Sequence, residues 1–260
     1  MNSQNQVGFT SISKKLFLRK PEYIQMIRIR AFRAIDEEES CFRFIDGHQK
    51  ILEVYGITKI TSNNTEWVYN RGTIVVIVEN EDGSKVYGGA RIQMYDGVMP
   101  LPIQTAISRY DSKINQLVDK GSSEICGLWN SREVTGMGIG SIILGRVTGA
   151  LIGMLPIYKT FMLCAPVTVK MCTSTGCVLV TEIGNNGLFY YPKDDLIATA
   201  MVVPDTRTME HAEPVEREWM FRLREKPNQV IIENTARGRL EIDFHLGVPV
   251  IDVSDFYHLD

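Results

Sequence analysis

The chain has 260 residues, of which 44% are hydrophobic and 23% charged, a composition typical of a globular protein with a sizeable core. Its formal net charge of −3 gives no reason to expect a nucleic-acid partner. Five cysteines without a CxxC pair and four histidines without ligand spacing predict neither a disulfide framework nor a metal site, which fits a reducing cytoplasm.

Two segments of the N-terminal half have patterns that predict secondary structure. Residues 1–15 are polar, lack an apolar core of signal-peptide length, and are expected to be a flexible lead-in. Residues 22–35 are predicted to form a helix, because their apolar residues recur at helical spacing. Residues 73–95 are predicted to form a β-hairpin, since "TIVVIVEN" and "KVYGGARIQMY" flank a turn with Asp-Gly at its centre.

A strand, a glycine run and an apolar helix follow one another in the middle of the chain. "SSEICGLWNSREV" (122–134) is predicted to be a strand, "VTGMGIGS" (134–141) is the glycine run, and residues 139–157 are predicted to be helical. Arg146 near the middle of the helix, four glycines and a proline favour a buried helix over a membrane span. Glycines four residues apart leave one face of this helix flat, and we expect that face to pack closely on a sheet.

The rest of the chain continues to alternate between strands and helices. Residues 160–165 and 177–184 are predicted strands on either side of a short helix that begins at Pro166. Residues 213–226 are predicted to be a helix, and the alternating residues 239–248 a half-buried strand. This order predicts an α/β or α+β fold with a mixed, largely antiparallel central sheet flanked by helices.

Three interpretations of the glycine run compete. Gly136-x-Gly138-x-x-Ser141 is close to the dinucleotide-binding fingerprint, which requires an acidic residue at the end of the next strand. That strand ends instead in Ala165 and Pro166, which counts against a dinucleotide. Alternatively, backbone N–H groups at a helix N-terminus cradle the phosphates of another ligand, or the run is a tight turn that binds nothing.

The order of strand, glycine run and helix resembles the pyrophosphate loop of the GNAT acyltransferases, whose pattern "xRGxGIGxxLL" is similar to "VTGMGIGSIIL". "VYGGARIQMYDGVMPLP" resembles the "GxxRLxxxxxPxml" stretch of the acyl-homoserine-lactone synthases and the long-chain N-acyl amino-acid synthases. "EICGLW" resembles their "ExSRF" strand. The sequence departs from these patterns at Thr135 and Gly127, where an arginine (or, at the first position, a glutamine) is usual.

The resemblance, which extends over residues 22–203, implies a fold and an activity. It implies a GNAT-like domain over residues 16–204 and an extension over 205–260 that packs on the same domain. The implied activity is an N-acyltransferase that moves a long-chain acyl group from acyl-CoA or an acyl carrier protein to the amine of an amino acid or similar small molecule, without a metal. The extension could cover an acyl tunnel, extend the sheet or form a homodimer contact.

Amine acylation requires a base for the amine proton and an N–H group for the developing oxyanion. Glu124 and, by the same logic, Asp46 are the catalytic candidates, and the alternative for Glu124 is charge pairing with a core arginine. Arg91 and Arg28 are the candidates for substrate binding. Arg91 could hold an acceptor carboxylate, or be an exposed strand arginine. Arg28 belongs to a basic segment that could dock an acidic carrier protein, or be a solvated helix face.

The resemblance also implies a set of residues that hold the thioester donor through their backbone. The oxyanion donor is expected near residues 128–130, and the phosphate cradle over 135–141. These residues are Leu128, Trp129, Asn130, Thr135, Gly136, Met137, Gly138, Ile139, Gly140 and Ser141.

Two rival hypotheses remain beside the acyltransferase. The departures at Thr135 and Gly127 motivate a non-catalytic GNAT-like module that binds acyl thioesters or a protein partner. The fingerprint-like spacing of the glycines motivates an NAD(P)-dependent oxidoreductase.

Overall fold

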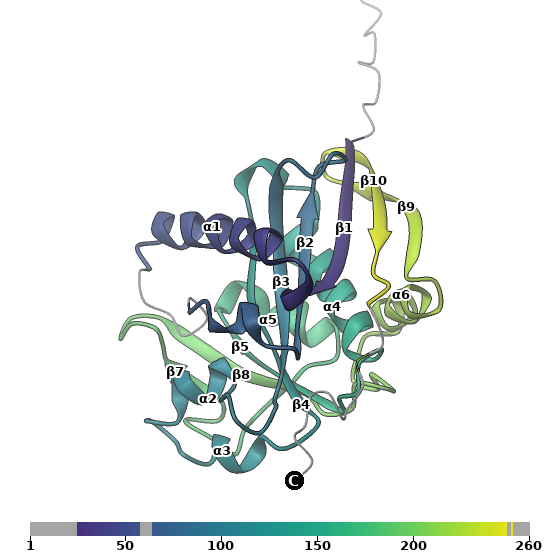
Figure 1. The fold of residues 1–260 in the computed structure, drawn as a ribbon. Coiled ribbons are helices and arrows are strands. Elements are labelled where there is room, and N and C mark those ends of the chain that lie inside the picture. Colours follow the sequence, from purple (N-terminus) through teal and green to yellow (C-terminus); the bar gives the residue numbers. More distant parts are fainter. Residues whose placement is uncertain (1–24, 58–63, 249–250, 252–260) are drawn as a thin grey trace, which may run out of the picture.

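The computed structural model describes residues 25–57, 64–248 and 251, so the predicted lead-in over residues 1–15 lies outside the described residues. A single mixed sheet runs through the described residues in the order β6-β8-β5-β4-β3-β2-β1-β10-β9, with β7 paired to β8 (Figure 1). Among its pairings, β4–β5 and β1–β10 are parallel and the others antiparallel, which agrees with the predicted class. The strands are β1 (Gln25–Arg33), β2 (Thr73–Glu79), β3 (Val86–Met94), β4 (Ser122–Asn130), β5 (Lys159–Cys164), β6 (Val178–Leu179), β7 (Leu188–Tyr190), β8 (Ile197–Val203), β9 (Asn228–Thr235) and β10 (Gly238–His245).

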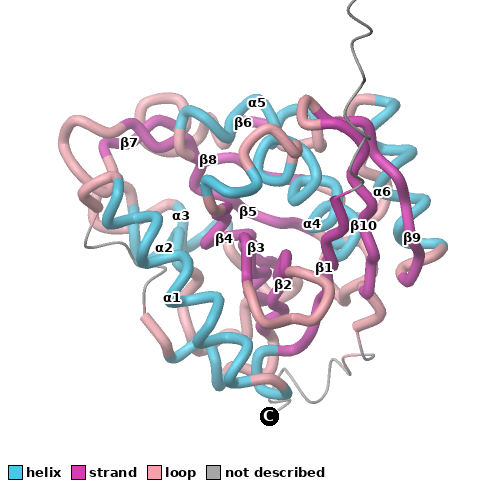
Figure 2. The backbone as a smooth tube through the Cα atoms, turned by 90° about the horizontal axis from the view of Figure 1, so that it is seen from above, coloured by secondary structure: helices cyan, strands magenta, loops and turns pink. Residues whose placement is uncertain are grey.

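Helices cover both faces of this sheet (Figure 2). One face carries α1 (Glu38–Val54), α2 (Pro102–Ile107) and α3 (Ile114–Leu117), and the other carries α4 (Leu144–Ile152), α5 (Pro166–Ser174) and α6 (Pro214–Glu225). The predicted hairpin is confirmed as β2 and β3, and every residue of β2 is buried. Because β2 has helices over both faces, its apolar residues run continuously instead of alternating with polar ones.

The helix predicted over residues 22–35 is wrong, because the described part of this segment is strand β1. Ile27 and Ile29, two residues apart, are buried in the core on the α4 side. Arg30, one residue further, contributes its Nε to a 2.8 Å ion pair with Glu79 Oε1. This period of two was hidden by arginines between the apolar residues, and pairing with β2 and β10 decides the backbone conformation.

Helix α1 was missed in the sequence, which reads there as an acidic run followed by a short segment. Its buried side is formed by Ser40, Cys41, Phe44 and His48, at helical spacing. Only Phe44 in this set is a large hydrophobic residue, so the periodic signal is weak. The helix therefore depends on packing against the sheet more than on its own amphipathic pattern.

The apolar helix predicted from residue 139 begins as a π-helical turn, Ile139–Ile143, and continues as α4. The glycines four residues apart, Gly145, Gly149 and Gly153, pack on helices instead of on the sheet: a Cβ on Gly149 would lie 2.2 Å from Met220 Sδ of α6. Arg146 of α4 forms a bidentate ion pair with Glu216 of α6, at 2.6 and 3.1 Å. A charged residue in an apolar helix is thus explained by a partner inside the protein.

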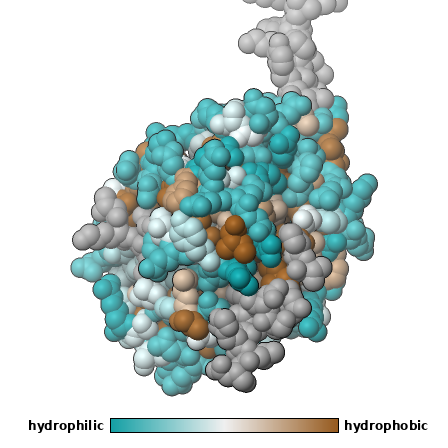
Figure 3. Space-filling model, viewed as in Figure 1, coloured by the Kyte–Doolittle hydropathy of each residue, from teal (hydrophilic) through white to brown (hydrophobic). Residues whose placement is uncertain are grey.

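Among the described residues, no helix has the length and apolar character that crossing a membrane would require. The side of the molecule shown in Figure 3 is mostly hydrophilic, with small separate hydrophobic patches.

The chain after residue 204 extends the sheet, one of the three roles left open by the sequence. Strand β10 pairs with β1 in parallel over six residue pairs, from Gln25–Leu240 to Arg30–His245, and β9 pairs with β10. Helix α6 packs on α4, with Met220 and Leu223 fully buried. The extension and the acyltransferase-like segment therefore share one core.

Helix α1 crosses the sheet at Gly47, where a Cβ would lie 2.1 Å from the buried indole of Trp129. We expect Gly47→Ala to lower the free energy of unfolding by about 1–3 kcal/mol through overpacking, although alanine favours a helix by about 1 kcal/mol over glycine. Urea unfolding followed by circular dichroism measures this. Gln49→Ala, at an exposed position of the same helix, is the control. Stabilisation by Gly47→Ala would contradict the close approach of α1.

Candidate functional site

Strands β4 and β5 pair for only three residues and then separate. Ser122–Glu124 pair with Lys159–Phe161, after which β4 continues to Asn130 and β5 to Cys164 without further pairing. A cavity of about 860 Å³ opens in this gap, a size suited to a small-molecule ligand. Beyond Glu124, the β5-facing edge of β4 has no strand partner among the described residues and borders the cavity.

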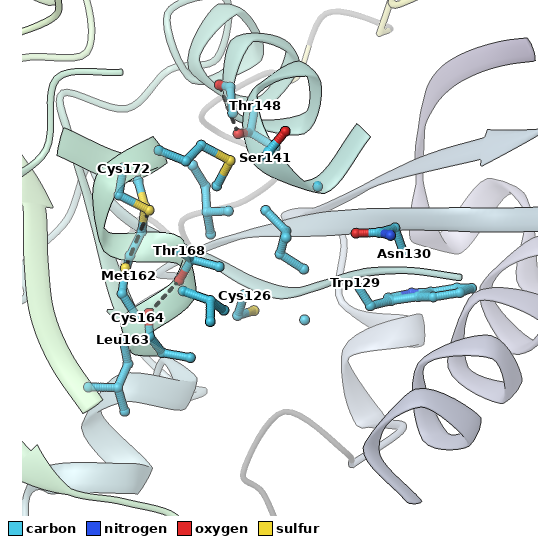
Figure 4. Close-up of a pocket in the computed structure, with 18 of the residues that line it drawn as sticks. Cys126, Trp129, Asn130, Ser141, Thr148, Met162, Leu163, Cys164, Thr168 and Cys172 are labelled. Carbon is cyan, nitrogen blue, oxygen red and sulfur yellow. Dashed lines mark hydrogen bonds between the residues drawn. The ribbon is translucent and has the colours of Figure 1, made fainter. Parts of the chain in front are cut away.

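The cavity reaches the layers on both faces of the sheet through the gap. Figure 4 shows Thr148 of α4 on one side of it, Met162 and Cys164 of β5 on a second, and Trp129 of β4 on a third. The inner end lies between α4, α5 and β8 and is mostly apolar; its lining includes Thr148, Ile152, Met162, Met171 and Met209. The outer end lies beside the C-terminal half of α1; its lining includes His48, Leu52, Tyr55, Glu124 and Tyr191.

A β-bulge shapes the cavity wall on β4. The register with β3 jumps from Gly89–Trp129 to Arg91–Cys126, so β4 has an extra residue at this point. Gly127 within the bulge has φ of +60°, a left-handed conformation that a residue with a Cβ adopts at a cost. The glycine found where the similar families have an arginine is therefore required here by the backbone.

The glycine run lies against the end of β4 and exposes free backbone N–H groups. Gly136 and Gly138 have φ of +82° and +79°, and their turns direct the chain into the π-helical start of α4. The N–H groups of Ile139, Gly140 and Ser141 have no acceptor among the described residues. Such free N–H groups at a helix N-terminus attract phosphate oxygens.

Nine of the ten residues predicted to hold a donor line the cavity. The exception is Met137, which is buried in the core and lines a smaller pocket behind the run. Gly140 lies directly against Asn130, because a Cβ there would come within 2.0 Å of Asn130 Oδ1. The end of β4 and the start of α4 are thus in contact, which makes the strand edge and the glycine run one continuous surface.

Glu124 is the buried acid of the cavity wall, with a relative exposure of 2%. Its Oε2 accepts a 2.6 Å hydrogen bond from the backbone N–H of Ile103, at the start of α2. Burial raises the pKa of this carboxyl to about 8, and the Ile103 N–H and the Arg91 charge only partly offset it. A carboxyl with this pKa can take up and release a proton near neutral pH.

Arg91 is neither an exposed strand arginine nor part of the described cavity lining. Its guanidinium lies 4.6 Å from the ring centroid of Trp67 and donates from Nε to Cys126 Sγ at 3.0 Å. Nη1 and Nη2 are buried without a hydrogen-bond partner among the described residues. No ion pair within 4 Å joins Arg91 to Glu124 in the described structure. The Arg91 charge therefore lowers the pKa of Glu124 through electrostatic interaction at a longer distance.

His48 is a site residue that the sequence did not single out; its surroundings "DGHQK" were interpreted as a candidate acceptor-side loop, but they lie within helix α1. It lies four residues after Phe44 on the buried side of α1 and lines the cavity. Burial, and then the Arg91 charge, lower its pKa to about 4, so the ring is neutral at pH 7. The spacing from Phe44 would have placed it, had α1 been recognised as a helix.

Asp46 and Arg28 are not brought to the cavity. The Asp46 side chain is 64% exposed on the far side of α1 and pairs with Lys50 at 2.6 Å. Arg28 lies on β1 beside Glu79 and Asp243, at 3.8 and 3.9 Å. The Asp46–Lys50 pair is exposed and contributes little to stability, whereas Arg28 lies beside the buried carboxylate of Glu79.

Sulfur atoms gather along the cavity wall on β4, β5 and α5. Burial raises the pKa of the Cys126 thiol to about 11, so it is protonated at neutral pH. Cys164 and Cys172 lie with their Sγ atoms 3.4 Å apart on the β5–α5 wall. Among the described residues, no three His, Cys, Asp or Glu side chains gather so as to hold a metal ion.

No family model and no curated protein matches the sequence. Solved structures do match. FeeM, an N-acyl amino acid synthase from uncultured soil microbes, superposes with a TM-score of 0.50 at 17% identity, over 72% of this chain and 94% of its own. BjaI, a CoA-dependent acyl-homoserine lactone synthase solved with SAM and isopentyl-CoA, superposes with a TM-score of 0.52 at 12% identity, over 87% of this chain and 96% of its own. The chain has the GNAT acyltransferase fold.

The GNAT fold also bears on the dinucleotide hypothesis. The glycine run does join two parallel strands through a helix, β4–α4–β5, as a dinucleotide site requires. That crossover stands alone on this side of the sheet, because β3 and β8, the outer neighbours of β4 and β5, are antiparallel to them. A dinucleotide-binding sheet instead repeats parallel crossovers on both sides of its switch point.

The pKa of Glu124 predicts a pH-dependent stability difference between the wild type and Glu124→Gln. The folded-state pKa of about 8 lies above the ordinary value of 4.5, so the folded state holds a proton that the unfolded state loses. Relative to Glu124→Gln, we expect the wild type to lose roughly 4 kcal/mol of unfolding free energy as pH rises from 4.5 through 8. Urea unfolding of both proteins across this range measures it. A constant difference would show that the carboxyl is not buried.

Proposed function

We propose that the protein is an N-acyltransferase that moves an acyl group from the thioester of CoA or of an acyl carrier protein to a primary amine, such as that of an amino acid. The observation that carries this proposal is the single cavity that joins the glycine run, an apolar chamber and the buried carboxyl of Glu124. The GNAT fold supports it, since FeeM and BjaI are acyl-transferring synthases.

The donor would lie along the wall formed by β4 and the start of α4. Free N–H groups of Ile139, Gly140 and Ser141 would hold its phosphates, with the positive end of the helix dipole behind them. The pantetheine arm has amide groups that can pair with the open edge of β4, as an added strand would. The thioester would then lie near residues 128–130, where a backbone N–H could stabilise the oxyanion.

The apolar inner end of the cavity would take the acyl chain. It is enclosed by α4, α5 and β8, and its wall includes Ile152, Met162, Met171 and Met209. Burying a methylene group in such surroundings contributes about 0.8 kcal/mol. A long chain therefore gains more from this chamber than an acetyl group does.

Glu124 would act as the base from the outer end of the cavity. Its ionised carboxylate takes a proton from the ammonium of the acceptor, and the freed amine attacks the thioester carbonyl. A carbon–nitrogen bond forms, the nitrogen gives up its second proton as the carbon–sulfur bond breaks, and the leaving thiolate takes up that proton. With a pKa of about 8, the carboxylate is a stronger base than an ordinary glutamate and is still partly ionised at neutral pH.

Arg91 would serve as a positioning residue for this chemistry. Its buried guanidinium opposes the effect of burial on the pKa of Glu124 and adds to the effect of burial that lowers the pKa of His48. Binding of an acceptor carboxylate by Arg91 stays a prediction of the sequence: Nη1 and Nη2 lack hydrogen-bond partners among the described residues, but Arg91 does not line the cavity.

The catalytic role of Glu124 is tested by thiol release from acyl-CoA in the presence of pooled amino acids, with products identified by mass spectrometry. We expect Glu124→Gln to lower kcat by about 10²–10⁴-fold, the usual contribution of a general base, with little change in thioester affinity. Asp46→Asn, outside the cavity, is the matched carboxylate control and should retain wild-type turnover.

Thioester binding without any acyl transfer by the wild type would overturn the enzyme and favour the non-catalytic module. Turnover by Glu124→Gln equal to that of the wild type would remove Glu124 from the mechanism. Loss of turnover in Asp46→Asn would mean that α1 adopts another position during catalysis.

The chamber predicts the chain-length preference. Ile152→Phe adds volume at the inner end, so we expect kcat/KM to fall about tenfold or more for long acyl chains and little for short ones. Ile142→Phe, beside the smaller pocket behind the glycine run, is the control. A series of acyl-CoAs of increasing length measures the preference, and thermal unfolding checks that both variants fold. Equal losses at all chain lengths would contradict an acyl chamber.

A further inference from the structure

The C-terminal extension reaches the glycine run through the turn between β9 and β10. Arg237, in this turn, donates from Nη1 to the backbone carbonyl of Glu133 at 2.7 Å, across 104 residues of sequence. A Cβ on Gly136 would lie 3.4 Å from Arg237 Cγ and 3.8 Å from its Nε. The aliphatic part of the Arg237 side chain thus lies against the glycine run, and its guanidinium is held by the backbone carbonyl of Glu133.

The turn that carries Arg237 is itself held by hydrogen bonds. Thr235 Oγ1 accepts from the Arg237 N–H at 3.1 Å and donates to the Gly238 carbonyl at 2.9 Å. Strands β9 and β10 pair up to the turn, with Thr235 opposite Gly238. The side chain is therefore presented from a rigid hairpin, which reduces the entropy lost when it binds a ligand.

The charge of Arg237 is available to a ligand. The carboxylate of Glu133 pairs with Lys85 Nζ at 2.6 Å, and only its backbone carbonyl is used by Arg237. Nε and Nη2 of Arg237 make no hydrogen bond to the described residues, and the side chain is exposed. Arg237 lies against the glycine run without being part of the cavity lining, whereas Arg132, just before the run, does line the cavity.

We infer that Arg237 binds a phosphate group of the thioester donor, so that the extension completes the donor site. This inference rests on the proposed function. Two cations and a row of free N–H groups match an anion with several oxygens, and a guanidinium binds phosphate through paired, charge-assisted hydrogen bonds. The phosphate is the chemistry that CoA and the 4′-phosphopantetheine of a carrier protein share.

Calorimetric titration of the full chain with CoA, with 4′-phosphopantetheine and with pantetheine tests this inference. We expect Arg237→Ala to weaken CoA binding about tenfold and to leave pantetheine binding unchanged, because pantetheine carries no phosphate. Arg239→Ala, an exposed arginine on β10, should bind all three ligands as the wild type does. Arg237→Lys, which keeps the charge but not the fork, should lie between.

The three ligands separate the outcomes. A loss for both phosphorylated ligands assigns Arg237 to the phosphate next to pantetheine, and a loss for CoA alone assigns it to the phosphates that only CoA carries; both support the inference. CoA binding by Arg237→Ala equal to the wild type overturns the inference and leaves the proposed function standing. Equal losses for CoA and pantetheine overturn it as a structural effect. A wild type that binds neither CoA nor 4′-phosphopantetheine overturns both.

Discussion

The early end of the β4–β5 pairing is the constraint on which the rest of the site depends. Two parallel strands that remained paired would bury their edges and fill the space between them. Here they share three residue pairs and then separate around the Gly127 bulge, so one strand edge, one helix start and two layers of side chains open onto the same cavity. The glycine run continues that edge, because Gly140 lies directly against Asn130.

A second constraint is electrostatic. Arg91 is fully buried under Trp67 and has two nitrogen atoms without partners among the described residues, an arrangement that costs free energy. The same charge opposes the protonation of Glu124 and His48, and it hydrogen-bonds Cys126. Buried charges stabilise a fold poorly, and this one acts on three groups that line the same cavity.

The parts that could be predicted from the sequence are those with strong local signals. The hairpin of β2 and β3 has continuous β-branched residues around an Asp-Gly turn, and the strand–glycine–helix order is contiguous. Glu124 followed from its place on the strand before the run. Strand β1 and helix α1 could not be predicted, because arginines interrupt the apolar period of the first and a histidine and a cysteine occupy the buried stripe of the second.

The sequence by itself determined where the backbone must turn and which stretches must be buried, because glycine spacing and apolar period act within a few residues. Only the tertiary structure decided which polar groups meet. On helix α1, the Asp46 side chain is exposed while His48 lines the cavity. Arg91 lies against the indole of Trp67, and Arg237 of the β9–β10 hairpin lies against the glycine run. These placements depend on sheet pairing between distant segments, and a raised pKa such as that of Glu124 depends on the burial that this pairing creates.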